Sequence, residues 1–382
     1  MRPLVVGLLA AMAVIAPTQV VQADDMRTRQ WYLGAMHSDE LWRVATGRGI
    51  TVAVVDTGVD STVPELRGKV RPGRDFYEGR GRGRTDNADT ERHGTNMSLA
   101  IAGDGSNGGV NGVAPGARIL PVRVGDKHSF GIAKSGSEGI RYAVDHGARV
   151  INISMAGAAV QAERAPWQAA VNYALQHGAL IFAGAGNDGT GNPQYPAAIP
   201  GVVAVAALKA DGTRADFSNH GDHIALAAPG VDMPGRCSVD RTKYCAFDGT
   251  SHATAIASAS AALIWSAHPE WTGNQVLRVM LQTAGHEGPV PSKYIGYGSV
   301  RPAQVLLEGK GDPGDPDVHP LLAARANHTP THTPTTPQQP TTAAAPHRGS
   351  PPWAAITVLV ATAGGLLLAL IRWRRHDPRS TP

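Results

Sequence analysis

The feature that most constrains the fold is a regular alternation of short apolar runs with stretches of helical pattern. The runs hold mostly Val, Ile, Leu and Ala, have no glycine in their interior, and are interrupted once, by Pro121. We therefore predict buried strands at residues 50–55, 118–124, 149–154, 179–183, 202–207 and 223–227. The helical patterns predict helices at residues 133–146, 162–177, 251–267 and 274–283, the last capped by Thr272 and Gln275. This alternation predicts an α/β fold, a three-layer sandwich in which helices cover both faces of a mostly parallel central sheet.

Active sites of such folds lie at the carboxyl ends of the strands, so motifs that follow a predicted strand receive the most weight. Asp56 directly follows the first apolar run, in the triplet Asp56-Thr57-Gly58. Taken alone, this triplet also fits an aspartic protease, in which two carboxylates share a proton. The chain has no second Asp-Thr-Gly or Asp-Ser-Gly triplet, so that alternative requires a dimer.

Two further motifs open predicted helices. His93 precedes a Gly-Thr pair and a small-residue stretch, which exposes an imidazole at a helix start; we expect the other fourteen of the fifteen histidines to be ordinary residues. Ser251 lies in the sequence Asp-Gly-Thr-Ser-His-Ala-Thr-Ala, where the helix 251–267 begins. Backbone N–H groups at a helix start are free to donate, and the helix dipole favours a developing negative charge. Without Asp56 and His93, a serine that only caps the helix would be the better interpretation.

The three candidates occur in the order Asp, His, Ser, which differs from the order in α/β-hydrolases and in the chymotrypsin type. In this order, and in its motifs, the chain resembles the subtilase family over residues 30–308. The further matching motifs are Asn-Gly-Val-Ala-Pro-Gly at 111–116, Val-Ile-Asn-Ile-Ser at 150–154, Phe-Ser-Asn at 217–219 and Ala-Ala-Pro-Gly at 227–230. The resemblance implies a subtilisin-like serine endopeptidase acting on polypeptides, with Ser251 as nucleophile, His93 as general base and acid, and Asp56 orienting the imidazole.

The resemblance also implies that the Asn187 side chain and the Ser251 amide hold the oxyanion. It implies that residues with mostly small side chains flank the P1 side chain without charge selection: Ser154, Met155, Ala156, Gly184, Ala185 and Gly186. The glycines of this second segment also spell Gly-x-Gly-x-x-Gly, a dinucleotide-binding pattern. Pro193, Pro196 and Pro200 follow, and they exclude the helix that such a phosphate-binding loop requires.

The chain departs from the family pattern beside the nucleophile. Ala255 stands four residues after Ser251, where subtilases usually carry proline, and we expect a modest loss of rate because an early-turn proline shapes the helix that aims the nucleophile. His252 replaces a larger apolar residue, and we interpret it as a tolerated variant, not as a second base. The resemblance further implies a cis peptide bond between Tyr195 and Pro196.

Both ends of the chain carry segments that we expect to lie outside the peptidase domain, which we place at residues 24–308. Residues 1–23 combine Arg2, an apolar run and small residues before a cleavage site at Ala23, the pattern of a signal peptide; an N-terminal anchor is the alternative, but the run is short for a bilayer. Residues 353–371 are uncharged and would span roughly 28 Å as a helix, which predicts a transmembrane helix more than a buried core helix. The arginines of the tail 372–382 predict that this tail is cytoplasmic.

The segment between the domain and the predicted membrane span has a different composition. Residues 309–352 contain ten prolines and almost no large apolar residue after Leu322, so we predict a Pro/Thr-rich linker. The formal net charge of +4 lies wholly in Arg2 and in the tail, and residues 24–352 balance 30 basic against 30 acidic residues. A neutral exported part does not indicate nucleic-acid binding.

The cysteines, histidines and acidic residues indicate whether to expect a disulfide or a metal site. Cys237 and Cys245 are the only two cysteines, and outside the cytoplasm we expect them to form a disulfide, with a free buried pair as the alternative. His220 and His223 lack a recognised metal-ligand spacing, and we find no acidic cluster that fixes a calcium site. We therefore predict neither a metal nor a cofactor.

The order of signal peptide, subtilase domain, proline-rich spacer and C-terminal transmembrane helix resembles the mycosins, membrane-anchored serine proteases of type VII secretion systems. The sequence at 119–124 also resembles theirs, and little room for a propeptide precedes Trp31. This implies a single-pass cell-membrane protein with an extracytoplasmic peptidase domain, which processes secreted substrates and stabilises the type VII secretion membrane complex. Two alternatives stay open: a structural component whose proteolysis is dispensable, and a general membrane subtilase with no secretion partner.

Overall fold

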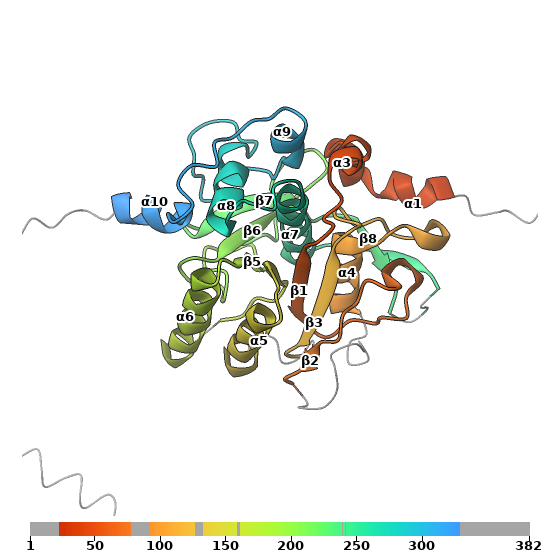
Figure 1. Ribbon diagram of the computed structural model, residues 1–382, viewed down its shortest axis with the longest axis horizontal. Helices are drawn as coiled ribbons and strands as arrows, with labels where there is room; N and C mark the ends of the chain where they lie inside the picture. Colours follow the sequence, from red (N-terminus) through yellow and green to blue (C-terminus); the bar gives the residue numbers. More distant parts are fainter. Residues whose placement is uncertain are drawn as a thin grey trace, which may run out of the picture. The chain divides into compact units, whose positions relative to one another are not determined.

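The computed structural model describes residues 23–77, 92–126, 133–158, 161–238, 240 and 242–328. Its centre is a seven-stranded sheet in the order β2-β3-β1-β4-β5-β6-β7, in which every neighbouring pair is parallel (Figure 1). The strands are β1 (Thr51–Asp56), β2 (Arg74–Asp75), β3 (Arg118–Arg123), β4 (Val150–Ile153), β5 (Leu180–Gly184), β6 (Val203–Leu208) and β7 (Ile224–Pro229). All six predicted strands are confirmed; within this sheet, as the structure describes it, the sequence pattern missed the two-residue β2.

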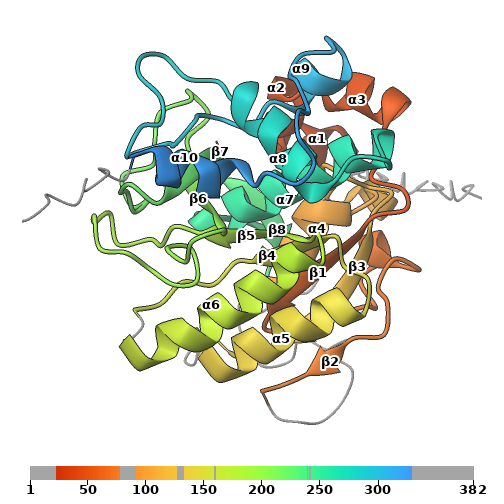
Figure 2. The ribbon, with the colours of Figure 1, turned by 60° about the vertical axis from the view of Figure 1, so that its left-hand side comes forward.

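Helices cover both faces of the sheet, so the predicted α/β layering is confirmed. One face carries α5 (Ala133–Asp145) and α6 (Gln161–Gln176), which lie side by side in Figure 2. The other face carries α4 (His93–Ala102), α7 (Thr250–Ala267) and α8 (Gly273–Gln282). Alternate residues of β1 divide between two cores: Val52 and Val54 pack with α4 and α7, whereas Ala53 and Val55 pack with α5 and α6.

Local sequence explains two details of these elements. Thr272 caps α8: its hydroxyl accepts from the Gln275 N–H, and the Gln275 side chain accepts from the Thr272 N–H at 3.0 Å, which confirms the predicted capping pair. Pro121 is tolerated inside β3 because alternate N–H groups of a strand point to opposite sides. Ile119 donates outward to Lys69 at 3.1 Å, so the nitrogen of Pro121 also faces outward, away from β1. The Tyr195–Pro196 bond is cis, as the resemblance implied.

Smaller elements surround this frame. Two of them form an antiparallel hairpin, β8 (Met233–Arg236) and β9 (Tyr244–Phe247), just before α7. The others are α1 (Ala23–Arg29), α2 (Trp31–Ala35), α3 (Ser38–Val44), η1 (Pro64–Leu66), η2 (Ser106–Gly108), α9 (Pro302–Leu306) and α10 (Pro320–His328).

The folded domain extends beyond the boundary at residue 308 that composition suggested. Residues 309–328 pack against α8, where the Arg278 guanidinium donates to the carbonyl oxygens of Asp315 at 2.8 Å and Val318 at 2.7 Å. Leu321 of α10 is buried in the core. A proline- and glycine-rich segment cannot build a core of its own, but here a side chain of the domain satisfies its backbone carbonyl groups.

The predicted signal peptide, the remainder of the linker and the predicted span at 353–371 lie outside the described residues, apart from Ala23. Within the described part of the chain, no helix combines the length and the apolar character needed to cross a bilayer.

Candidate active site

Asp56 is the last residue of β1, so it lies at the carboxyl edge of the sheet. All six residues of this strand are buried. The side chain of Asp56 is fully buried. Its Oδ1 accepts a hydrogen bond from the Thr57 N–H at 2.8 Å and lies 2.7 Å from Nδ1 of His93. The second oxygen, Oδ2, is buried and has no hydrogen-bond partner. A buried carboxylate at this distance holds the imidazole in one tautomer and stabilises its protonated form.

His93 is the first residue of α4, and a glycine locks that helix start against β1. The N–H of Gly94 donates to Oγ1 of Thr57 at 3.0 Å. A Cβ at Gly94 would lie 2.1 Å from the carbonyl oxygen of Gly58, so no larger residue fits there. The close approach brings the imidazole onto Asp56 and leaves 16% of the His93 side chain exposed to the cleft.

Ser251 is the second residue of α7, and a reciprocal pair of hydrogen bonds joins it to the segment after β4. Its Oγ donates to the carbonyl oxygen of Ser154 at 3.0 Å, and Oγ of Ser154 donates to the carbonyl oxygen of Ser251 at 2.9 Å. Behind them, Asn152 donates to Ser154 at 2.9 Å and accepts from Ser258 at 3.1 Å. The nucleophile candidate therefore stands on a buried polar chain that links α7 to β4.

Asn187 lies beside the start of α7 with its amide orientation fixed. Its Oδ1 accepts from the N–H of Thr250 at 2.9 Å and from Oγ1 of Thr250 at 3.0 Å, so Nδ2 is the atom left to donate into the cleft. A Cβ built at Gly249 would lie 3.6 Å from Nδ2 of Asn187 and 3.7 Å from the N atom of Ser251. Two donor nitrogen atoms therefore lie near one point at a helix N-terminus, where an oxyanion can be stabilised.

His93, Ser251 and Asn187 line one cavity of about 320 Å³, whereas the buried Asp56 reaches it only through His93. Five of the six residues that we expected to flank the P1 side chain line it: Ser154, Met155, Ala156, Gly184 and Gly186. Ala185 does not, because its side chain is fully buried and its N–H donates to Val205 in the sheet at 3.0 Å. Eight other lining residues were not among the predicted site residues: Asn96, Met97, Asp188, Gln194, Phe247, Asp248, Thr250 and His252.

His252, the residue after the nucleophile candidate, lines this cavity with a neutral ring. Its ring stacks on Phe247, with the centroids 6.0 Å apart and the planes at 18°. Burial, together with the charge of nearby His93, lowers the pKa of His252 to about 3. It therefore stays neutral through the range in which a protease works, which agrees with its interpretation as a variant and not a second base.

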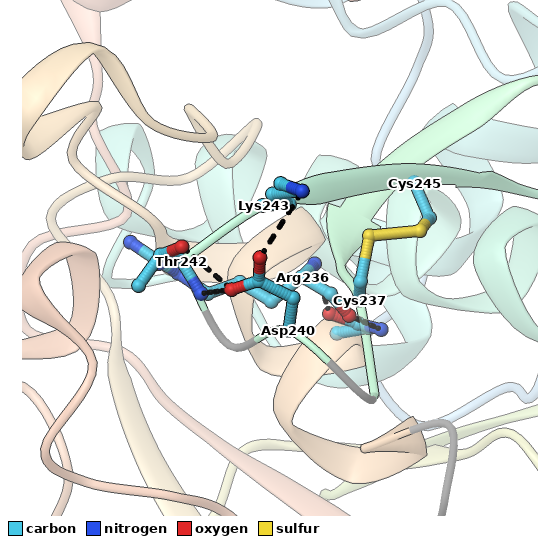
Figure 3. Close-up of a disulfide and its surroundings, with 7 residues drawn as sticks. Arg236, Cys237, Asp240, Thr242, Lys243 and Cys245 are labelled. Atoms are coloured by element: carbon cyan, nitrogen blue, oxygen red, sulfur yellow. Dashed lines mark hydrogen bonds and ion pairs between the residues drawn. A yellow bond between two sulfur atoms is a disulfide. The ribbon is translucent and has the colours of Figure 1, made fainter.

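The β8–β9 hairpin forms the side of the site that carries Phe247, and it is braced in two ways. Cys237 and Cys245 form a disulfide with an S–S distance of 1.98 Å (Figure 3). In the turn between them, Asp240 accepts from Thr242 at 2.6 Å and pairs with Lys243 at 3.3 Å. The hydrogen bonds from Thr242 hold the pKa of the exposed Asp240 below its usual range.

The second brace is a fully buried carboxylate, Glu65. Arg236 of β8 donates to both of its oxygens at 3.0 Å, and the Tyr244 hydroxyl of β9 donates to Oε1 at 2.6 Å. Burial and this carboxylate raise the pKa of Tyr244. Asn96 of α4 exchanges two hydrogen bonds with the Arg236 backbone, at 3.1 Å and 2.8 Å. The hairpin is thus tied to the helix that begins with His93.

No three His, Cys, Asp or Glu side chains converge as a metal site among the residues that the structure describes. Of the two histidines considered as ligands, His220 lies against the ring of Tyr294 with the centroids 5.2 Å apart. Burial is the main cause that lowers the pKa of His223.

Known proteins with similar sequences belong to the subtilase family. The model of the subtilase family matches residues 47–298. Subtilisin E of Bacillus subtilis (strain 168) is 35% identical over 259 residues, which are 67% of this chain and 65% of the subtilisin. The cell wall-associated protease of the same bacterium is 38% identical over 237 residues, 61% of this chain and 25% of that protein. The chain thus spans less than two thirds of the length of these relatives.

Solved structures of similar fold include proteases of type VII secretion systems. MycP1 from the ESX-1 type VII secretion system has a TM-score of 0.66 and 28% identity, over 76% of this chain and 88% of that chain. MycP1 from Mycobacterium smegmatis has a TM-score of 0.64 and 27% identity, over 75% and 86%. MycP3 of the ESX-3 system has a TM-score of 0.62 and 29% identity, over 72% and 88%.

Proposed function

The chain belongs to the subtilase family of serine endopeptidases, and from that premise we propose that it hydrolyses peptide bonds through an acyl-enzyme on Ser251. The observation that carries the proposal is the meeting of three elements at one cavity. The His93–Asp56 contact of 2.7 Å, the Ser251 hydroxyl and the Asn187 amide all lie at the carboxyl edge of the sheet. Acyl transfer requires a serine, a histidine base with its carboxylate and an oxyanion donor at one cavity.

In the first half of the reaction, Oγ of Ser251 leaves its hydrogen bond to Ser154 and attacks the peptide carbonyl carbon, while Nε2 of His93 takes its proton. Asp56 stabilises the imidazolium that forms. The negative charge on the former carbonyl oxygen is held by Nδ2 of Asn187 and the N–H of Ser251. His93 then gives its proton to the leaving amine, and the C–N bond breaks to leave an ester on Ser251.

In the second half, a water molecule takes the place of the leaving amine. His93 accepts a proton from this water, the hydroxide attacks the ester carbon, and the proton returns to Oγ of Ser251 as the acid product leaves. The segment of Ser154, Met155 and Ala156 lies along the cavity, where an extended substrate can pair with it as an added strand. Gly184 and Gly186 line the same cavity and leave room for a P1 side chain.

We extend the proposal to the setting of the enzyme. Similarity to MycP1 and MycP3, joined with the predicted signal peptide and the predicted span at 353–371, supports a cell-membrane protein of mycosin type. Its peptidase domain would lie outside the membrane and its tail 372–382 in the cytoplasm. It would process substrates of a type VII secretion system and stabilise the membrane complex of that system.

Hydrolysis itself is tested on a peptide library of random sequence, with cleavage read by mass spectrometry. The wild-type protein is expected to cut a limited set of peptides, and Ser251→Ala is expected to cut none. Ser266→Ala is the matched control, because Ser266 lies in the same helix and its hydroxyl bonds the Leu263 carbonyl at 2.8 Å, away from the cavity. Equal cleavage by Ser251→Ala would refute the proposed nucleophile.

The secretion role separates from hydrolysis in cells. A scaffold whose proteolysis is dispensable predicts that secretion survives Ser251→Ala but stops when residues 353–371 are replaced. A processing protease predicts that Ser251→Ala leaves secreted substrates uncut. A general membrane subtilase predicts that affinity purification of the Ser251→Ala protein from membranes recovers no secretion component, and that outcome would overturn the proposed setting.

A further inference from the structure

The residue before His93 has an unusual backbone. Arg92 has φ 50° and ψ 45°, in the left-handed region, and is one of four non-glycine residues with positive φ in the described part of the chain. It is the N-cap of α4: its carbonyl oxygen accepts from the N–H of Asn96 at 2.9 Å, while its side chain makes no capping bond. A left-handed arginine costs free energy and persists only where its surroundings fix it.

The side chain of Arg92 is held in place by burial and by an ion pair. Only 4% of it is exposed, and its guanidinium pairs with Oδ2 of Asp60. Its Nε is buried without a hydrogen-bond partner, so the ion pair with Asp60 is the principal polar contact of a buried charge. A buried guanidinium depends on such a partner, because the uncompensated charge is strongly unfavourable.

Asp60 belongs to the loop that directly follows β1, whose last residue is the candidate triad carboxylate, Asp56. Two hydrogen bonds already join this loop to α4 after His93: the N–H of Gly94 donates to Thr57 at 3.0 Å, and the N–H of Asp60 donates to Thr95 at 2.9 Å. The Arg92–Asp60 pair joins the same loop to the residue before His93. This one loop therefore contacts the residue before His93 and the two residues after it, and so fixes the position of the imidazole.

We propose that Arg92 is a positioning residue for His93: through its ion pair with Asp60 it holds the left-handed turn that sets where α4 begins and so keeps the imidazole on Asp56. This inference rests on the proposed hydrolytic function of the same site. Arg92 contacts neither substrate nor reacting atoms, and it is absent from the residues that line the cavity. Its effect is expected in the chemical step and not in substrate binding.

Steady-state kinetics on the best-cut library peptide test this directly. Arg92→Ala is expected to lower kcat by about ten- to a hundredfold, the effect of a small displacement of a catalytic group, with KM changed less than about twofold. Arg92→Lys keeps the charge and is expected to recover most of kcat. Asp60→Asn is expected to lower kcat as much as Arg92→Ala does. The double variant is expected to lower kcat no further than either single variant, because both single variants remove the same ion pair.

A second readout needs no turnover. The proton on Nδ1 of His93, in a short hydrogen bond to Asp56, is expected to give a low-field proton NMR signal in the wild-type protein. We expect this signal to shift or disappear in Arg92→Ala and Asp60→Asn and to persist in Arg92→Lys. Because this signal needs no turnover, it tests the inference even if the wild-type protein cuts no peptide, which would refute only the proposed function.

The matched control is Arg149→Ala. Arg149 lies just before the amino end of β4, whereas the candidate site lies at the carboxyl ends of the strands. Its guanidinium is 4.3 Å from the centroid of the Trp265 ring and donates to the Pro269 carbonyl oxygen. Its loss is expected to lower Tm without changing kcat or the His93 signal. If Arg92→Ala fails to fold, Arg92→Lys and Asp60→Asn carry the comparison. The inference is overturned if Asp60→Asn keeps both kcat and the signal, or if Arg92→Lys loses as much as Arg92→Ala.

Discussion

Replacement of Asn187 by alanine removes two things that the structure separates. The first is Nδ2, which with the N atom of Ser251 lies near the same point, 3.6 and 3.7 Å from where a Cβ at Gly249 would stand. Loss of such a donor raises the barrier by about 3 to 4 kcal/mol, so kcat should fall by about 10² to 10³ with little change in KM. The second is Oδ1, which accepts from the N–H and hydroxyl of Thr250 at 2.9 and 3.0 Å. Loss of this cap-like acceptor should cost about 1 kcal/mol of stability.

Asn187→Asp separates the two effects. The aspartate keeps an acceptor for Thr250 at the same place, so Tm should stay near that of the wild type. It replaces the donor by a negative oxygen, so kcat should fall at least as far as in Asn187→Ala. Initial rates on a cut peptide and calorimetry of the same preparations measure both quantities. A fall in kcat of less than about threefold in both variants would refute the oxyanion assignment.

Three further predictions concern stability. Cys237→Ser opens the hairpin disulfide and should lower the free energy of unfolding by about 2 to 3 kcal/mol in urea titrations, whereas an unchanged midpoint would contradict this. Gly94→Ala brings a Cβ to 2.1 Å from a backbone oxygen and should lower Tm far more than Gly34→Ala, where nothing lies within 4 Å; equal Tm values would show that the close approach is not required. The pKa of His252 is lowered to about 3, below its unfolded value of 6.5, so its stabilising contribution is present above pH 6.5 and is lost as the pH falls towards 3. Between pH 7 and 5 the wild type should lose about 2 kcal/mol more than His252→Leu, and parallel losses would contradict the shift.

The sheet and its covering helices could be predicted because their signals are local. Each of the six predicted strands is a mostly buried run, and the pair Thr272 and Gln275 marks a helix start through neighbouring groups alone. Asp56 could be predicted as a candidate because it ends a buried strand, whereas the choice of His93 and Ser251 depends on helix-start motifs and on the resemblance to subtilases.

Contacts between distant residues could not be predicted in this way. Glu65 meets Arg236 and Tyr244 across 171 and 179 residues, and no pattern near any of them signals a buried cluster. Ala185 looks equivalent to its flanking glycines in sequence, but the pleat of the sheet turns it away from the cavity. The left-handed Arg92 is equally hidden, because arginine carries no preference for that conformation.

The packing of residues 309–328 shows how composition alone misplaces a boundary. Their prolines and glycines indicate a segment without a core, and that inference is sound for the segment by itself. The guanidinium of Arg278, which satisfies three backbone carbonyl groups of this segment, lies in α8 and cannot be inferred from the segment's own sequence.

The claim that this site forms an acyl-enzyme on Ser251 is tested most directly with a fluorophosphonate probe, which an activated serine attacks with loss of fluoride. Intact mass and peptide mapping should show one phosphonyl adduct on Ser251 of the wild-type protein. Ser251→Ala should carry none, and His93→Ala should react far more slowly because its serine lacks a general base. A folded wild-type protein that takes up no probe, or an adduct that persists in Ser251→Ala, would contradict the account.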